Sequence, residues 1–438
     1  MRGCGSGRPQ YRPAAPGGAR SRGRPLHSPA PDPTAAWPRP HGCIAAPTVQ
    51  RTPPHLLTLT LLTALSALTL NMILPSLPAM SRELGARESV VALTVSGYMM
   101  VSALFQLTLG PVSDRLGRRP VMLAALGLYV LASLGCMLAP DIGTLLACRV
   151  LQGAIIAGSV VSSAAIRDQY SVRDSAGKLG AIASAMAVAP MLGPMLGGYL
   201  DGAFGWRAAF ALYTAMGAAL LVVVWLDMGE TRQPGRPPPR LRDGAALLAS
   251  GRYRAHVLCA AFSVGAFFVF VTGVPYVATA VWGMPPAQVG LGVGSITGGF
   301  MLGAAITARL APRHGIAPLI IAGRLLSLLA LAVALALFAA GLSHPLALFG
   351  LTVFVGLGNG LTISNANVGA MAVRPDLAGT AAGLGGALSI ALGAVLSGMT
   401  ALAVERSATP GRLLLLMLGC VLLSLVAALA ARRLDRRA

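Results

Sequence analysis

Long apolar stretches separated by short polar gaps repeat along the chain from His55 onward. A helix that crosses a lipid bilayer needs about 20 apolar residues, and twelve stretches of about that length can be marked off. The pattern therefore predicts an all-α membrane protein with twelve transmembrane helices. The first six are predicted at 55–77, 90–109, 120–138, 142–166, 179–200 and 208–226, and the last six at 257–281, 289–310, 316–339, 346–371, 378–402 and 413–430.

Composition agrees with this pattern. Hydrophobic residues make up 55% of the 438 residues and charged residues only 11%, whereas soluble domains carry about 25% charged residues. The net charge of +20 would also suit a nucleic-acid-binding protein. The arginines, however, lie in short gaps and form no compact basic domain, so cationic loops of a membrane protein explain the charge better.

The gaps also indicate the domain organisation. Residues 1–52 are rich in Arg, Pro and Gly, which predicts a disordered tail that either touches anionic headgroups or results from a start site assigned too far upstream. Six-helix bundles over 53–227 and 256–431, joined by a basic loop at 228–255, would form an internal repeat with a site between the halves. Residues 432–438 would be a second tail. Channels and membrane enzymes can be equally apolar, but the repeat favours a transporter.

Basic residues alternate between the gaps. One set of gaps is rich in arginine, and the opposite set holds few basic residues, mostly beside acids. The positive-inside rule places the first set in the cytoplasm, so both termini would be cytoplasmic. The first set comprises Arg115, Arg118, Arg119, Arg167, Arg173, Lys178, the loop at 228–255, Arg309, Arg313, Arg374 and the cluster at 432–437.

The gap after the second segment reads GPVSDRLGRRP over residues 110–120. Glycine and proline suit a tight turn, and Asp114 could pair with the arginines or face a helix N-terminus. Such a latch would hold one access state at the cytoplasmic side, whereas the simpler interpretation is a basic loop with one stray acid. The candidate gate residues are Gly110, Asp114, Arg115, Gly117, Arg118 and Arg119.

These residues carry a resemblance. Residues 93–123, LTVSGYMMVSALFQLTLGPVSDRLGRRPVML, are similar to the second helix and following loop of the major facilitator superfamily, above all of its Bcr/CflA drug-resistance branch. The likeness extends over residues 55–430 through six further stretches: LLACRVLQGAIIAG, AAIRDQY, APMLGPMLGGYL, GWRAAF, FVTGVPYVATAVWGMPPAQVG and AGTAAGLGGAL. The resemblance implies alternating access between two bundles in a bacterial inner membrane and, in most relatives, export driven by inward proton movement.

The fifth segment holds prolines and glycines that would disrupt a soluble helix. In a membrane, small residues allow close approach, and prolines kink helices while neighbours satisfy the freed carbonyls. With Gly298, Gly299 and Gly303, they predict a tight crossing of the fifth and eighth helices between the halves. By the resemblance this motif marks antiporters, and simple packing is the alternative. Its residues are Pro190, Gly193, Pro194, Gly197 and Gly198.

Arg149 lies about 7 residues, or about 10 Å, into the fourth segment. A charge at that depth costs about 2.5–3.5 kcal/mol on insertion scales, so Arg149 should face a cavity or a partner unless it snorkels. Asn71 lies at a similar depth in the first segment and could share a site with it. Arg324 is nearer its helix end, where snorkelling is expected. Further cavity candidates, each of which could instead join helix to helix, are Tyr98, Gln106, Gln152, Asn365 and Asn367.

Relatives in the resembling branch usually carry aspartate where this chain has Asn71, and asparagine cannot titrate. No Asp, Glu or His falls in the middle of a predicted segment, although a proton-coupled antiporter needs a titratable group in its cavity. Coupling could instead use Asp201 or Glu88 near the outer mouth, or Asp114 or Asp168 near the inner one. Without a cavity carboxylate, neutral or anionic compounds are favoured over lipophilic cations.

The sequence therefore predicts a monomeric secondary transporter that exports small neutral or anionic amphipathic compounds by alternating access, coupled to proton antiport. Its expected partners are a small-molecule substrate, protons and the lipid bilayer, and not nucleic acid. No enzymatic, cofactor or metal-ligand pattern is apparent in the sequence. A nutrient or metabolite permease without proton antiport, and a non-transporting receptor, stay open as alternatives.

Overall fold

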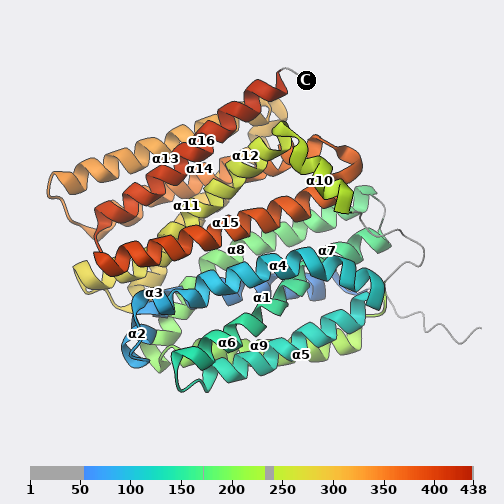
Figure 1. Cartoon of the computed structure of the whole chain (residues 1–438), viewed down its shortest axis with the longest axis horizontal. Helices are drawn as coiled ribbons and strands as arrows, with labels where there is room; N and C mark the ends of the chain where they lie inside the picture. Colours follow the sequence, from blue (N-terminus) through green and yellow to red (C-terminus); the bar gives the residue numbers. More distant parts are fainter. Residues whose placement is uncertain (1–53, 171, 232–240, 437–438) are drawn as a thin grey trace, which may run out of the picture. The chain divides into compact units, whose positions relative to one another are not determined.

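The structure is a computed structural model that describes residues 54–170, 172–231 and 241–436. The predicted tail at 1–52 and much of the predicted basic loop lie outside these ranges. Three short 3-10 turns, η1 (Leu74–Ser76), η2 (Gly153–Ile156) and η3 (Pro375–Leu377), accompany the α-helices (Figure 1). The α-helices are α1 (Leu56–Asn71), α2 (Leu77–Glu83), α3 (Glu88–Val91), α4 (Leu93–Leu116), α5 (Arg118–Met137), α6 (Ile142–Gln152), α7 (Ala157–Gln169), α8 (Val172–Phe204), α9 (Arg207–Asp227), α10 (Leu241–Ala249), α11 (Gly251–Trp282), α12 (Pro286–His314), α13 (Ile316–Ala339), α14 (Pro345–Ala372), α15 (Ala378–Arg406) and α16 (Pro410–Asp435).

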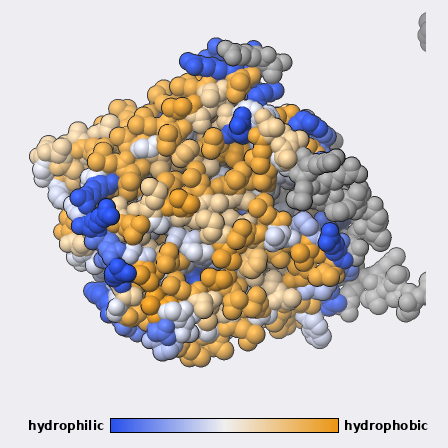
Figure 2. Space-filling model, viewed as in Figure 1, coloured by the Kyte–Doolittle hydropathy of each residue, from blue (hydrophilic) through white to orange (hydrophobic). Residues whose placement is uncertain are grey.

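Eleven helical stretches among the described residues are long and apolar enough to cross a membrane, and each overlaps a predicted segment. The remaining predicted segment, 179–200, lies inside α8, a helix of 33 residues. Large apolar side chains such as Leu131, which is 69% exposed, cover much of the outside, and Figure 2 shows a face dominated by hydrophobic residues. Because soluble proteins do not expose apolar patches of this extent, the predicted all-helical membrane fold is confirmed.

Successive spans turn alternately at two ends of the molecule. The turns at 116–118, 227–251, 314–316 and 372–378 lie at what we term the basic end, which also holds the arginines at the end of α16. The turns at 83–88, 137–142, 204–207, 282–286, 339–345 and 406–410 lie at the opposite end.

Local sequence explains how these turns stay short. Gly117 has a φ of 102°, a backbone conformation that favours glycine, so α5 begins directly after α4 ends. Gly315, with a φ of 76°, does the same between α12 and α13. At the opposite end, Asp141 caps α6 by accepting hydrogen bonds from the Thr144 hydroxyl (2.7 Å) and backbone N–H (3.0 Å). These hydrogen bonds lower the pKa of the Asp141 carboxyl.

We call α1–α9 the N-terminal half and α11–α16 the C-terminal half. The halves pack along two helix pairs, α4 with α15 and α8 with α12, and Figure 1 shows α4 and α15 side by side. At the opposite end, the Tyr276 hydroxyl on α11 donates to the Glu88 carbonyl of α3 (3.3 Å). Described contacts therefore bring the halves together at the end opposite the basic end.

The predicted tight crossing of the fifth and eighth helices is present between α8 and α12. A Cβ at Gly198 would overlap the Pro286 carbonyl, and a Cβ at Gly290 would overlap the Pro194 carbonyl. Glycine at these two positions is therefore what lets the two backbones touch.

The assignment of Gly298, Gly299 and Gly303 to this crossing is wrong. Gly299 and Gly303 lie against the backbone of α14, and a Cβ at Gly298 would meet nothing within 4 Å. Nine residues separate Gly290 from Gly299, which is about 2.5 helical turns, so the two glycines lie on opposite faces of α12. Gly299 and Gly303 therefore pack α12 within the C-terminal half.

Candidate functional site

Arg149 lies in the interior of the N-terminal half, where its side chain is 1% exposed. Its Nε donates to the Thr94 carbonyl (3.1 Å), and its Nη1 donates to the Thr69 carbonyl (3.3 Å) and to Gln152 Oε1 (2.7 Å). Its Cζ lies 4.4 Å from the centroid of the Tyr98 ring. In the described part of the chain all of these partners are neutral, and Nη2 has none. Arg149 is thus a buried cation without a carboxylate.

A second layer of hydrogen bonds fixes these partners. Gln152 Nε2 donates to Ser133 Oγ (2.7 Å), and the Tyr213 hydroxyl donates to the Thr69 carbonyl (3.2 Å). Thr69 Oγ1 and the Tyr129 hydroxyl are 2.8 Å apart. The network joins α1, α5, α6 and α9, so it holds the guanidinium in one orientation.

Asn71 does not share this network. Its Nδ2 donates to the Ala67 carbonyl one turn back (2.7 Å), and its Oδ1 is buried without a described partner. A Cβ at Gly193 would lie 3.1 Å from the Asn71 Cβ, and one at Gly197 would overlap the Met72 carbonyl. Because α1 ends against this glycine face of α8, Asn71 faces α8, and the predicted Asn71–Arg149 contact is absent from this conformation.

Arg324 does not extend to the membrane surface as the sequence predicted. Its side chain is fully buried, with Nε donating to Thr362 Oγ1 (2.8 Å) and Nη2 to Asn359 Oδ1 (2.8 Å). The prediction that Arg324 snorkels is wrong because α14 offers these polar side chains in place of solvent. Gly323 and Gly358 have little space at their Cα atoms, which brings α13 and α14 close enough for the contact.

The other predicted cavity residues are dispersed. A Cβ at Gly386 of α15 would lie 2.8 Å from Gln106 Nε2, so Gln106 lies at the α4–α15 contact. Asn365 is buried and donates to the Leu361 carbonyl (2.7 Å), whereas Asn367 is exposed. The structure therefore brings together Arg149, Gln152 and Tyr98 but not the whole predicted set.

His256 directly precedes the segment predicted at 257–281, and the structure extends that helix over it. Helix α11 begins at Gly251, before the predicted start at residue 257, so His256 lies inside a candidate span and is buried. Its Nε2 is 3.1 Å from Asp435 Oδ2, and Arg252 Nε donates to Asp435 Oδ1 (2.9 Å). The ion pairs allow the charged first turns of α11 to remain helical.

Two of the predicted gate residues, Asp114 and Arg118, form an ion-pair cluster with Asp168 at the basic end. Arg118 Nη2 is 2.5 Å from Asp114 Oδ1 and 3.2 Å from Asp168 Oδ2, and Arg118 Nη1 donates to Ser113 Oγ (2.5 Å). Arg115 is exposed beside this cluster, and Gly110 has open space at its Cα.

Glu230 completes the cluster and was missed by sequence analysis. Its carboxylate accepts the backbone N–H groups of Arg118 (2.9 Å) and Arg119 (3.3 Å), so it caps the first turn of α5. A Cβ at Gly117 would overlap this carboxylate. The partners described for Arg118 and Arg119 all precede α10, so within the described residues these two arginines do not bridge the halves.

Two candidate proton sites lie at the opposite end. Asp201 on α8 is partly buried, and its Oδ2 is buried without a partner among the described residues. Glu88, at the start of α3, is partly buried where the two halves meet, a boundary that we call the seam. Asp168, the third candidate, lies at the basic end in the pair with Arg118.

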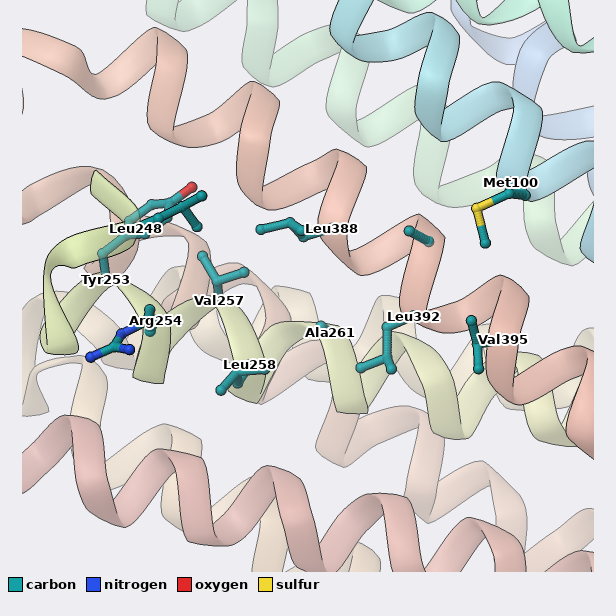
Figure 3. A pocket seen from close by; sticks show the side chains of 11 residues that line it. Met100, Leu248, Tyr253, Arg254, Val257, Leu258, Ala261, Leu388, Leu392 and Val395 are labelled. Atoms are coloured by element: carbon teal, nitrogen blue, oxygen red, sulfur yellow. The ribbon is translucent and has the colours of Figure 1, made fainter. Parts of the chain in front are cut away.

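An apolar pocket of about 430 Å³ lies where the halves meet, between α4, α10, α11 and α15 (Figure 3). Met100 of α4 lines it together with side chains of α11 and α15 such as Leu258 and Leu392. None of the predicted cavity residues lines this pocket. The sequence does not reveal this pocket, because apolar side chains that face a cavity have the same spacing as those that face lipid.

Comparison with known proteins matches residues 59–398 to the family described as the Major Facilitator Superfamily. A chloramphenicol resistance protein of Pseudomonas aeruginosa is 30% identical over 337 residues, which are 76% of this chain and 79% of that protein. A bicyclomycin resistance protein homolog of Haemophilus influenzae is 29% identical over 386 residues, 85% of this chain and 94% of that one.

A crystal structure of a D-xylose–proton symporter superposes with a TM-score of 0.70, covering 86% of this chain and 96% of the symporter at 15% identity. At that identity the likeness concerns the fold alone. Together with the helix order described above and the family match over most of the chain, it establishes that the chain belongs to the Major Facilitator Superfamily, a family of multi-pass membrane transporters and not of enzymes.

Proposed function

We propose that this transporter belongs to the Bcr/CflA drug-resistance branch and exports small neutral or anionic amphipathic compounds across a bacterial inner membrane. The observation that carries the proposal is the uncompensated guanidinium of Arg149, whose described partners are all neutral. In a low-dielectric interior a positive charge acts over long distances. It therefore repels cations in transit and attracts anions.

The distribution of carboxylates supports the same substrate class. In the described ranges every Asp and Glu lies within one turn of a helix end or between helices. A lipophilic cation would find no counter-charge in the middle of the membrane to offset its desolvation. The names of the two drug-resistance relatives support export as the direction.

We further propose that the basic end is cytoplasmic, with both termini inside, as the positive-inside rule requires. Contacts between the halves at the opposite end then correspond to an inward-facing state. Bundles over 53–227 and 256–431 would rock about the α4–α15 and α8–α12 pairs within a monomer. The gate cluster around Arg118 would engage the C-terminal half only in the other state.

Proton coupling is assigned first to Asp201. A buried carboxylate oxygen without a hydrogen-bond partner is costly while ionised, and protonation removes that cost. Glu88 is the second candidate, because it lies at the seam that must open. Asp168 is ranked third, because its ion pair with Arg118 stabilises the ionised carboxylate and so opposes uptake of a proton.

A permease without proton antiport is the second candidate function, and Asn71 favours it. The branch that the sequence resembles usually has a carboxylate there, whereas this chain has a side chain that cannot exchange a proton. The two functions differ in one measurable quantity, the response of substrate flux to a pH gradient.

The test reconstitutes the protein in liposomes that enclose a pH-sensitive dye. Matched neutral, anionic and cationic amphiphiles are presented with and without a pH gradient. Antiport predicts proton movement linked to flux of neutral and anionic compounds, and loss of that link in Asp201→Asn. The control Asp376→Asn removes an exposed carboxylate paired with Arg374 and should change nothing. Flux that ignores the gradient would favour the permease, and preferential flux of cations would contradict the proposed substrate class.

A further inference from the structure

The apolar pocket at the seam has one cationic end. Of the described residues that line it, Arg254 is the charged one, and the others are mostly aliphatic. Figure 3 shows Arg254 at one end of the row of lining side chains and Met100 and Val395 at the other. The pocket surface is therefore almost wholly apolar, with one charged side chain at one end.

Arg254 is available to a ligand. It is exposed, and no hydrogen bond or ion pair joins it to another described residue. Its neighbour Arg252 differs, because that guanidinium is bound to Asp435. Among the described residues, Arg252 is thus ion-paired and Arg254 is not.

The geometry of α11 places Arg254 beside one end of the pocket. The Tyr253 hydroxyl donates to the Ala381 carbonyl of α15 (2.8 Å), and His256 contacts Asp435 of α16, which fixes the rotation of the helix. Arg254, Leu258 and Ala261 are four and three residues apart and share one face. About 10 Å of helix separates Arg254 from Ala261, so the cation is followed by an apolar stretch of that length.

We propose that this pocket binds the transported compound as an amphipathic monoanion, with its carboxylate or sulfonate on Arg254 and its apolar body between α11 and α15. The inference rests on the proposed export function and adds a specificity-determining residue to it. A volume of about 430 Å³ lies in the range of small-molecule sites. Met100 comes from the N-terminal half, Leu248 from α10 and the rest of the lining from the C-terminal half, so the ligand would lie where rocking changes the pocket.

Binding is measured on the full-length protein in nanodiscs by the fluorescence of three probes that share one aromatic body, 1-pyrenebutyrate, 1-pyrenebutanol and 1-pyrenebutylamine. The wild type should bind the carboxylate about tenfold more tightly than the alcohol, and the amine least. Arg254→Gln should remove that preference, lowering affinity for pyrenebutyrate three- to tenfold, as expected for a partly exposed ion pair. Ala391→Phe, which fills the apolar part, should weaken all three probes.

The matched control is Arg433→Gln, which removes an exposed arginine at the same end without touching the pocket. It should leave all three affinities unchanged. An equal loss in Arg433→Gln, or full pyrenebutyrate binding in Arg254→Gln or Ala391→Phe, would overturn the assignment. The binding is also compared between nanodiscs made of phosphatidylglycerol and nanodiscs made of phosphatidylcholine. Loss of probe binding in phosphatidylglycerol alone would assign the pocket to a bilayer lipid and would also overturn the proposal. Because binding is read without flux, failure of transport and failure of this site are separate results.

Discussion

Arg149 and Tyr98 form a cation–π contact inside the N-terminal half, with the guanidinium carbon 4.4 Å from the ring centroid. The contact joins α6 to α4, and both side chains are buried. A desolvated cation–π contact contributes about 2 kcal/mol, which offsets only part of the several kcal/mol that burying a charge costs. The hydrogen bonds from Nε and Nη1 offset a further part, and a buried intramembrane charge of this kind is typical of residues retained for function.

Replacing Arg149 by methionine tests this interpretation. Loss of the guanidinium removes its desolvation cost together with the contacts that offset it, and it leaves no described carboxylate unpaired. We therefore expect Arg149→Met to keep or raise the unfolding temperature in detergent while export of anionic amphiphiles is lost. The matched control is Arg324→Met, which removes a buried guanidinium in the C-terminal half that also has neutral partners. It should retain export. An Arg149→Met protein that exports normally would contradict a functional role for the charge.

A second test restores a carboxylate at Asn71. The Oδ1 atom of Asn71 is buried without a described partner, so an aspartate there would be driven to take up a proton or to attract a cation. We expect Asn71→Asp to make flux depend on pH and to admit cationic amphiphiles. Asn365→Asp is the matched control, because Asn365 makes the same bond to the carbonyl one turn back but lies in the other half. If Asn71→Asp keeps the wild-type pH profile and substrate range, the first helix does not carry the coupling site.

The sequence predicted the helices well because their signal is local. Each span needs about 20 apolar residues, and that requirement can be counted along the chain. The start of α11 was placed too late because Arg252, Arg254 and His256 look like loop residues. In the structure, Asp435 pairs with two of them and the third lines the pocket. The partner is far along the chain, so no local pattern shows it.

The site was harder to predict because it depends on which way helices face. Arg149 and Gln152 were predicted only as separate cavity candidates, and the structure joins them by a hydrogen bond between side chains three residues apart on one face of α6. Asn71 does not reach Arg149 because it packs against α8 at Gly193. Glu230 reaches the start of α5 because Gly117 leaves room for its carboxylate. Both results depend on tertiary packing. Depth in the membrane can be read from a sequence, but rotation about the helix axis cannot.

The glycine contact between the halves gives a third prediction. A methyl group at Gly290 would overlap the Pro194 carbonyl, so Gly290→Ala must push α12 away from α8. We expect it to favour the state in which the opposite end is open, and to cost about 1–3 kcal/mol in the closed state. Labelling of a cysteine introduced at Tyr276, where the halves touch at that end, should accelerate. Gly298→Ala is the control, because a Cβ there meets nothing within 4 Å. Equal labelling in the two variants would contradict tight packing as the reason for glycine at position 290.

The ion pair of Arg118 and Asp168 should hold α5 to α7 strongly, because both side chains are less than a tenth exposed. Removing one partner of a buried pair costs about 3–5 kcal/mol, and we expect about 2 kcal/mol for Asp168→Asn because Asp114 still pairs with Arg118. The double variant Asp114→Asn with Asp168→Asn should then lose more than the sum of the single changes, since it leaves the guanidinium uncompensated. Thermal unfolding in detergent measures both. Asp376→Asn breaks an exposed pair with Arg374 and should leave the unfolding temperature unchanged. If the stability loss of the double variant equals the sum of the two single losses, Arg118 becomes solvated once both carboxylates are removed. The ion pairs would then not hold the predicted gate residues in place.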